Sequence, residues 1–355
     1  MKRLTLAYAL GALILAIGLT STLSTASAAD AEQIAGYDQF VFDAPHRAGK
    51  VGASVWYPVG TKTYKGIIGE NPLFEGTPAY VGAEVADGRF PLVLLSHGSG
   101  GNMDGLSWLS SALAARGAMV LAVNHPGSTT GDSSPRRSVK LDERAADLSV
   151  ALDRLLETPV FADHIDRGRI GALGFSLGGA TALGLGGLRF DRELWGQYCD
   201  RLGPDAADCV FFAKGGIDYS DLPDGFEAAM RDDRVSSVVA VDPGLSYAVT
   251  ADNAAKTDVP VLFVSLGREN LWPAADVSET GSGLVGRIAD ATHVTLSPAH
   301  HFTFLQVCKP DGAKMLREEN DDPICDDPAG TDRAKIHAEI VDEVAAWLGL
   351  GNRTN

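Results

Sequence analysis

Positive charge is scarce in this 355-residue sequence, and so are the usual metal-binding patterns. Lysine and arginine together number 30, aspartate and glutamate number 46, and the formal net charge is −16. A surface of this kind repels phosphate backbones and anionic lipid headgroups, which argues against a nucleic-acid partner. The four cysteines form no C-x-x-C pair, and the acidic residues 318–332 lack the spacing of an EF-hand. We therefore expect a solvated loop at 318–332 and no metal site.

The sequence has only one long apolar run, at residues 4–19, and no later segment is apolar for long enough to cross a bilayer. Two basic residues precede this run and small residues follow it. This order is typical of a secretory signal peptide, residues 1–28, cleaved after Ala28 or Ala29. The alternative is an uncleaved membrane anchor, but the run is short and no basic stop-transfer cluster follows it. We expect a protein exported to a periplasm or to the medium, without a membrane span after cleavage.

Internal repeats and low-complexity linkers are also absent, so we expect residues 29–355 to form one domain. Buried-strand patterns alternate with helical spacing, which predicts an α/β fold with a mostly parallel central sheet flanked by helices. The expected strands cover residues 51–57, 91–96, 118–123, 169–175, 237–241, 260–264 and 293–296. The expected helices cover 106–116, 142–157, 176–185 and 331–348. In the last helix Asp332 is the expected N-cap, Gly349 lies near the end, and His337 is expected at the surface.

Residues 190–234 form a long stretch that is rich in aromatic side chains. We interpret it as a cap-like insertion beside the functional site, and the alternative is a peripheral loop. It contains two of the four cysteines. Four cysteines allow three pairings, and in an exported protein we favour local ones, Cys199 with Cys209 and Cys308 with Cys325. Free buried thiols are the competing interpretation.

The most informative motif is GFSLG, residues 174–178, which fits the pattern G-x-S-x-G. In this motif a serine lies on a sharp turn between a strand and a helix, with its hydroxyl exposed. The flanking glycines are needed because larger side chains would collide with the neighbouring elements. An apolar strand precedes the motif here, and a helix rich in alanine and leucine follows it. Ser176 is therefore the expected nucleophile.

A second glycine-rich sequence, HGSGG at residues 97–101, follows an expected strand. Attack of a serine on an ester creates an oxyanion, which needs fixed N–H donors. Leu177, directly after the nucleophile, is expected to supply one donor, and Ser99 is the candidate for the other. The alternative is an ordinary glycine turn. We expect His97 to shape this loop rather than to titrate in catalysis.

A nucleophilic serine needs a histidine to take its proton and an acid to orient that histidine. In the chain order serine, acid, histidine, the base follows the last strand, where His300 and His301 are both candidates. Asp242 ends an expected strand and precedes a Pro-Gly turn, where a parallel sheet presents catalytic side chains. Glu269 and Asp276, after the next strand, are the alternatives for the acid.

The segments LLSHGSGG, GFSLGGATALG, VVAVDPG and HHFTFLQVC, in this order, resemble the predicted dienelactone hydrolases related to secreted platelet-activating factor acetylhydrolases. The upstream SVWYPVG and the downstream DDPAGTDRAKIHAEI also resemble this family, so the likeness covers nearly the whole chain after residue 28. It implies the α/β-hydrolase fold and ester cleavage without a metal or other cofactor. It assigns Ser176 as nucleophile, Asp242 as acid and His301 as base.

The same resemblance implies oxyanion donors at Ser99 and Leu177. Dienelactone hydrolases use a cysteine nucleophile, whereas this sequence has a serine, so a short- or medium-chain carboxylic ester is a better expectation than a lactone. We therefore expect a serine ester hydrolase acting on a small-molecule or lipid-like ester. The alternatives are a lipase or phospholipase, a peptidase or acyltransferase, and a non-catalytic binding protein of this fold. If Cys308 and Cys325 pair, we expect their bridge to anchor the loop of His301.

Overall fold

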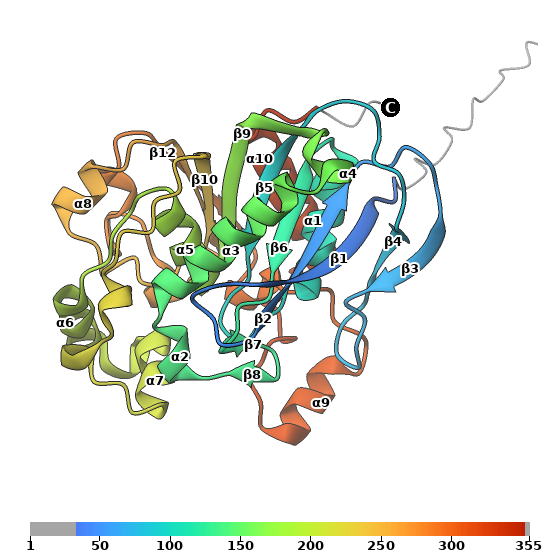
Figure 1. The fold of residues 1–355 in the computed structure, drawn as a ribbon. Helices are drawn as coiled ribbons and strands as arrows, with labels where there is room; N and C mark the ends of the chain where they lie inside the picture. The colour runs from blue at the N-terminus through green and yellow to red at the C-terminus, as the bar shows by residue number, and fades with distance from the viewer. Residues whose placement is uncertain (1–32, 352–355) are drawn as a thin grey trace, which may run out of the picture. The chain divides into compact units, whose positions relative to one another are not determined.

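A ten-stranded sheet forms the centre of the computed structural model, which describes residues 33–351. The expected signal peptide, residues 1–28, lies outside the described residues. The strand order is β12-β11-β10-β9-β5-β6-β2-β1-β4-β3 (Figure 1). The strands are β1 (Gly36–Asp43), β2 (Lys50–Tyr57), β3 (Tyr64–Ile68), β4 (Thr77–Val81), β5 (Phe90–Ser96), β6 (Met119–Val123), β9 (Ile165–Phe175), β10 (Val235–Val241), β11 (Val261–Leu266) and β12 (Ala291–Leu296). A separate ribbon pairs β7 (Ser128–Thr129) with β8 (Asp132–Ser133).

The strands from β12 to β6 run parallel to one another, which confirms the expected mostly parallel sheet. Every residue of β6 and β11 is buried, because helices cover both faces at these strands, and this explains their continuous apolar sequences. The sheet continues through β2, which pairs antiparallel with β6, into the strands β1, β4 and β3. The sequence patterns had not predicted β1, β3 and β4.

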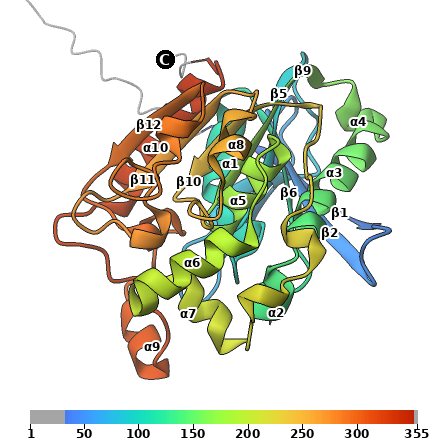
Figure 2. The ribbon, with the colours of Figure 1, turned by 90° about the vertical axis from the view of Figure 1, so that its left-hand side faces the viewer.

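Helices cover both faces of the sheet (Figure 2). On one face lie α1 (Ser107–Ala115) and α10 (Arg333–Trp347), and on the other lie α3 (Leu141–Leu156) and α5 (Leu177–Leu185). The shorter helices are α2 (Pro135–Ser138), α4 (Pro159–Ala162), α6 (Arg192–Leu202), α7 (Ala207–Lys214), α8 (Ala251–Ala255) and α9 (Gly312–Glu319). Within residues 33–351, no helix has the length and hydropathy of a membrane span.

The closing helix α10 has the N-cap and the terminal glycine that its sequence predicts, but the burial of His337 differs from the prediction. Asp332 caps it by accepting a hydrogen bond from the Lys335 N–H at 3.1 Å, and Gly349 follows it with φ +60°. His337 was expected at the surface and is buried instead. Its ring stacks on Trp108 of α1 at 3.7 Å between centroids, because the two helices pack against each other.

Residues 190–234 fold into α6, α7 and short 3-10 turns, which lie beyond the carboxyl ends of the parallel strands (Figure 2). Trp195 is fully buried here and stacks on Phe226 at 5.0 Å between centroids. A disulfide joins Cys199 to Cys209 across the segment. The second disulfide joins Cys308 to Cys325, so both local pairings expected from the sequence are present.

The acidic residues 318–332 are more structured than the solvated loop expected from their composition. Helix α9 continues through Glu319, and Asp327 receives a hydrogen bond from the Arg333 guanidinium at 2.9 Å. Thr303 also donates to Asp327, at 2.8 Å. Although burial opposes it, these contacts and His300 hold the pKa of Asp327 well below its ordinary value. The acidic stretch is therefore fastened to the loop that contains the predicted histidine pair.

Candidate active site

Ser176 lies on the sharp turn between β9 and α5 that the GFSLG motif predicts. Its backbone has φ +56° and ψ −122°, so helix α5 begins one residue later than expected, at Leu177. A Cβ on Gly174 would lie 1.9 Å from the Gly178 carbonyl oxygen, and one on Gly178 would lie 2.0 Å from the Ser96 carbonyl oxygen. Both positions therefore require glycine for the strand and helix to approach this closely.

Two hydrogen bonds connect Ser176 to a buried carboxylate. The Oγ of Ser176 lies 3.1 Å from Nε2 of His301, and Nδ1 of His301 lies 3.0 Å from Oδ2 of Asp242. The other oxygen of Asp242 accepts a hydrogen bond from the Leu266 N–H at 2.8 Å. Asp242 is fully buried directly after β10, with φ +41°. A carboxylate can only accept, so Nδ1–H of His301 donates to Oδ2, which leaves Nε2 as the acceptor that faces the serine hydroxyl.

Two aromatic side chains hold the ring of His301. Trp272 stacks on it with 4.1 Å between centroids and 12° between planes, and Phe175 lies 4.5 Å away on a tilted plane. His301 is consequently only 3% exposed. This packing restricts the ring to the orientation in which its two nitrogens face the serine and the carboxylate.

The alternative residues considered from the sequence lie elsewhere. The Nε2 of His300 faces Asp327 at 3.3 Å rather than the serine. Asp276 accepts a hydrogen bond from the Ser278 N–H at 2.9 Å. In the described part of the chain, neither Asp276 nor Glu269 is hydrogen-bonded to His301. The structure thus brings together Ser176, His301 and Asp242 and leaves the other candidates apart.

The two expected oxyanion donors flank the serine. Leu177 is the first residue of α5, so its N–H has no partner within the helix. Ser99 follows Gly98, at which a Cβ would lie 3.2 Å from the Cβ of Ser176. Within residues 33–351, neither the Ser99 nor the Leu177 N–H donates a hydrogen bond to a protein acceptor. Both residues line the cleft beside Ser176.

The serine opens onto a cleft of about 1410 Å³, which residues 190–234 and the acidic stretch 318–332 help to line. Its walls include Ser176, His301, Trp272, Phe302, Phe211 and Asp322. Phe211 belongs to residues 190–234, and Asp322 belongs to the acidic stretch 318–332. Asp208 of α7 also lines the cleft, and burial raises the pKa of its carboxyl group. The cleft is wide enough for a substrate of drug-like size.

A second serine–histidine–aspartate series, which the sequence did not predict, joins Ser96, His125 and Asp147. The Nε2 of His125 lies 2.9 Å from Ser96 Oγ, and its Nδ1 lies 2.9 Å from Asp147 Oδ2. All three side chains are fully buried, and burial lowers the pKa of His125 to about 3. With His125 buried and its pKa lowered, the series forms a hydrogen-bonded bridge between β5 and α3.

One sequence signal could have revealed this network. Arg144 lies four residues before Leu148, and Asp147 lies directly before Leu148. Both charged residues therefore fall beside the apolar stripe of the expected helix 142–157. Charged side chains at such positions are rarely left without partners. In the structure both are buried on α3.

Comparisons with known proteins agree with this architecture. The model of the alpha/beta hydrolase fold family matches residues 91–189. A bis(hydroxyethyl) terephthalate hydrolase of Streptomyces coelicolor is 31% identical over 110 residues, which are 31% of this chain and 33% of that protein. The alignment therefore spans about a third of the length of this curated relative.

Two solved structures also align with this chain, to different extents. A ferulic acid esterase from Streptomyces cinnamoneus has a TM-score of 0.58 and 19% identity, with 90% of each chain covered. A dienelactone hydrolase from Anabaena variabilis has a TM-score of 0.43 and 14% identity, covering 80% of this chain and 95% of that one.

The sheet order, the serine turn between strand and helix, and the family match together define a protein of the α/β-hydrolase fold. The α/β-hydrolase fold that the sequence resemblance implies is therefore confirmed.

Proposed function

We propose that this protein is an exported serine hydrolase that cleaves carboxylic esters through an acyl-enzyme intermediate. The observation that carries the proposal is the uninterrupted series of hydrogen bonds from Ser176 through His301 to the buried Asp242. A serine at the apex of a strained turn, with a histidine and a held carboxylate behind it, is the arrangement that activates a hydroxyl for nucleophilic attack.

In the proposed first step, Ser176 Oγ attacks the ester carbonyl carbon while Nε2 of His301 takes the hydroxyl proton. Asp242 keeps Nδ1 of His301 protonated and stabilises the imidazolium that forms. The carbonyl oxygen becomes an oxyanion and accepts hydrogen bonds from the N–H groups of Ser99 and Leu177. His301 then gives its proton to the leaving alkoxide, which departs as an alcohol and leaves the acyl group on Ser176.

In the second step a water molecule takes the place of the alcohol. His301 removes a proton from the water, and the hydroxide attacks the acyl carbonyl carbon. The tetrahedral intermediate collapses, the bond to Ser176 Oγ breaks, and the serine regains its proton from His301. The products are a free carboxylic acid and the resting enzyme. The step requires no residue beyond those that form the acyl-enzyme.

The substrates that we propose are esters with a short or medium acyl group. The proteins similar to this chain include a hydrolase of bis(hydroxyethyl) terephthalate and a ferulic acid esterase, whose names both denote action on an aromatic acid or its ester. Several aromatic side chains line the cleft beside Ser176, among them Phe211, Trp272 and Phe302. These surfaces would accept the apolar part of an acyl or alcohol group.

The first test is labelling of the purified protein with a fluorophosphonate probe, with Ser176→Ala as the control. We expect labelling of the wild type and none of the variant, followed by hydrolysis of p-nitrophenyl acetate and butyrate. Ethyl ferulate and bis(hydroxyethyl) terephthalate complete the panel. A correctly folded wild type that is not labelled would favour the non-catalytic alternative and overturn the proposal.

Two further measurements test whether the protein is an esterase or a lipase and whether it is exported. Rates on dissolved and micellar tributyrin separate an esterase from a lipase, and we expect no rise in rate when micelles form. Export is supported by the sequence of residues 1–28 and by the two disulfides, since disulfides persist in oxidising compartments. Amino-terminal sequencing of protein recovered from outside the cytoplasm should begin at residue 29 or 30.

A further inference from the structure

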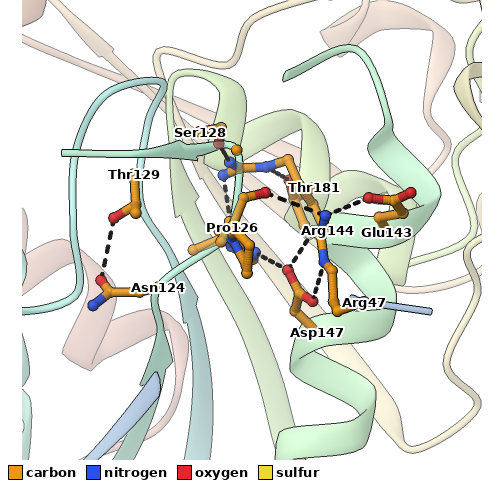
Figure 3. A network of polar contacts seen from close by, with 12 residues as sticks. Arg47, Asn124, Pro126, Ser128, Thr129, Glu143, Arg144, Asp147 and Thr181 are labelled. Atoms are coloured by element: carbon orange, nitrogen blue, oxygen red, sulfur yellow. Dashed lines mark hydrogen bonds and ion pairs between the residues drawn. The ribbon is translucent and has the colours of Figure 1, made fainter. Parts of the chain in front are cut away.

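A buried arginine, Arg144, contacts Ser128 and Thr181 of neighbouring segments (Figure 3). Arg144 of α3 is only 1% exposed. Its guanidinium group donates hydrogen bonds to acceptors from three other segments of the chain: Thr181 Oγ1 at 3.0 Å, Ser96 Oγ at 3.1 Å, Ser128 Oγ and the His97 carbonyl oxygen. In the described residues no carboxylate lies within ion-pair distance of it.

Burying a positive charge in this environment costs desolvation free energy. Burial lowers the pKa of Arg144 to about 9, and the negative charge of the neighbouring Asp147 opposes this shift. An apolar side chain of similar size would fill the same volume without the desolvation cost. The value of an arginine here therefore lies in the groups that its hydrogen bonds hold in place.

Those groups adjoin both proposed oxyanion donors. On one side, the His97 carbonyl is held by Arg144, and the Gly100 N–H donates to the Ser128 carbonyl at 2.9 Å, so backbone groups on both sides of Ser99 are fixed. On the other side, Thr181 accepts from Arg144 and donates its hydroxyl proton to the Leu177 carbonyl at 3.1 Å.

A neutral histidine completes the support of the loop. The Nδ1 of His97 lies 2.7 Å from the Gly98 carbonyl oxygen, and its Nε2 accepts a hydrogen bond from the His125 N–H at 3.2 Å. Burial holds the pKa of His97 well below its ordinary value, so it keeps one donor and one acceptor nitrogen. His97 thus shapes the loop, as expected from the sequence, and Arg144 fastens it to the helix that carries Leu177.

We propose that Arg144 is a positioning residue that fixes the Ser99 and Leu177 N–H groups relative to each other, so that both face one oxygen in the transition state. This inference rests on the proposed function. Ser99 lies on the loop after β5 and Leu177 lies on α5, and a guanidinium group bonded to both segments couples their positions. A small displacement of either donor would weaken stabilisation of the oxyanion without altering how the neutral ester binds.

The variants Arg144→Met and Thr181→Val test the proposal. The first removes all the arginine contacts, and the second is nearly isosteric and removes only the hydroxyl link to α5. The matched control is Arg234→Met, because Arg234 also donates several hydrogen bonds, to Asp232 and Asp153, but lies directly before β10. Each variant is assayed for kcat and KM on p-nitrophenyl butyrate and for inhibition by a trifluoromethyl ketone.

The ketone reports on the oxyanion site directly. Ser176 Oγ adds to its carbonyl carbon, the serine proton passes to His301, and the carbonyl oxygen becomes an oxyanion that needs the same two donors. For Arg144→Met we expect kcat to fall about 10- to 100-fold, with affinity for the ketone falling by a similar factor and KM changing less than about 3-fold. For Thr181→Val we expect kcat and the affinity for the ketone each to fall about 3- to 10-fold. The pH midpoint of kcat should not move, because His301 and Asp242 are untouched.

Several outcomes would overturn the positioning role. One is a folded Arg144→Met with wild-type kcat, and another is a loss of kcat without a matching loss of affinity for the ketone. A fall in kcat as large in Arg234→Met would assign the effect to stability alone. If Arg144→Met does not fold, Thr181→Val decides the question by the same criteria. A wild type that the fluorophosphonate does not label overturns the proposed function first, so the two failures are distinguishable.

Discussion

The Oγ of Ser176 and the Nε2 of His301 lie 3.1 Å apart, although 125 positions separate the two residues in the chain. This hydrogen bond joins the turn after β9 to the loop after β12. These two strands are not neighbours in the sheet, because β10 and β11 lie between them. It is the contact on which proton transfer from the serine would depend. Both residues line the cleft, through which a substrate would reach the serine.

The paired variants His301→Ala and His300→Ala separate two neighbouring residues with different contacts. We expect His301→Ala to lower kcat by about 1000-fold or more, because the serine loses its base. His300→Ala should change kcat by less than about 10-fold, because His300 faces Asp327 and is not bonded to the serine. Steady-state kinetics on p-nitrophenyl butyrate check both. Equal losses in the two variants would contradict the assignment of the base.

The variant Asp242→Asn should lower kcat by about four orders of magnitude while the protein stays folded. An amide in this place can still accept the Leu266 N–H, but its NH₂ group would turn Nδ1 of His301 into an acceptor and place a proton on Nε2. Asp276→Asn is the matched control, because its carboxylate contacts Ser278 instead. Circular dichroism verifies folding, and near-normal kcat in Asp242→Asn would exclude it as the acid.

Removal of the disulfide between Cys308 and Cys325 should affect both stability and catalysis. In the structure Asp327, two residues after Cys325, accepts a hydrogen bond from Thr303, two residues after His301. Loss of a crosslink that closes a loop of this size costs about 3 kcal/mol of unfolding free energy. The double variant Cys308→Ser/Cys325→Ser should therefore melt at a lower temperature and label more slowly with the fluorophosphonate.

The other disulfide supplies the control for this experiment. Cys199→Ser/Cys209→Ser opens a loop in residues 190–234, which carry none of the three proposed catalytic groups. We expect a comparable loss of melting temperature with a smaller change in labelling rate. Unchanged labelling and stability in Cys308→Ser/Cys325→Ser would refute the anchoring role of that bridge.

His337 should make the folded state sensitive to acid. Burial lowers its pKa from 6.5 to about 4, against the raising effect of its hydrogen bond to the Thr303 carbonyl. The unfolded chain binds this proton near pH 6.5 and the folded chain resists it, so the stabilisation is complete above pH 6.5 and is lost as the pH falls toward 4. Between pH 7.5 and 4.5 the loss from this residue is about 2 to 3 kcal/mol.

Urea unfolding at pH 7.5 and pH 4.5 measures this loss, with His337→Gln as the comparison. Glutamine keeps an N–H donor for Thr303 but does not titrate. The buried His97 and His125 also resist protonation, and they contribute equally in both proteins. The wild type should therefore lose more stability than the variant between the two pH values, and an equal loss in both would rule out His337 as the source.

Much of the fold followed from local patterns in the sequence. The continuous apolar runs of β5, β6 and β11 identify buried parallel strands, because both faces of such strands are covered. The GFSLG motif locates its turn because only glycine at positions 174 and 178 permits the close contact between β9 and α5. The strands β1, β3 and β4 lie toward one edge of the sheet and are partly exposed, so their sequences carry a weaker periodic signal.

The sequence by itself indicated the type of chemistry that we propose, since a serine in this turn, a downstream aspartate and a downstream histidine occur in the required order. Only the tertiary structure decided which neighbour faces the serine, because His300 and His301 are adjacent and the path of their loop directs one ring to Asp327 and the other to Ser176. It also placed Arg144 against the glycine-rich loop, because its hydrogen bond to the His97 carbonyl spans 47 positions. Local patterns report local backbone preferences, whereas contacts over such separations exist only once the chain has packed.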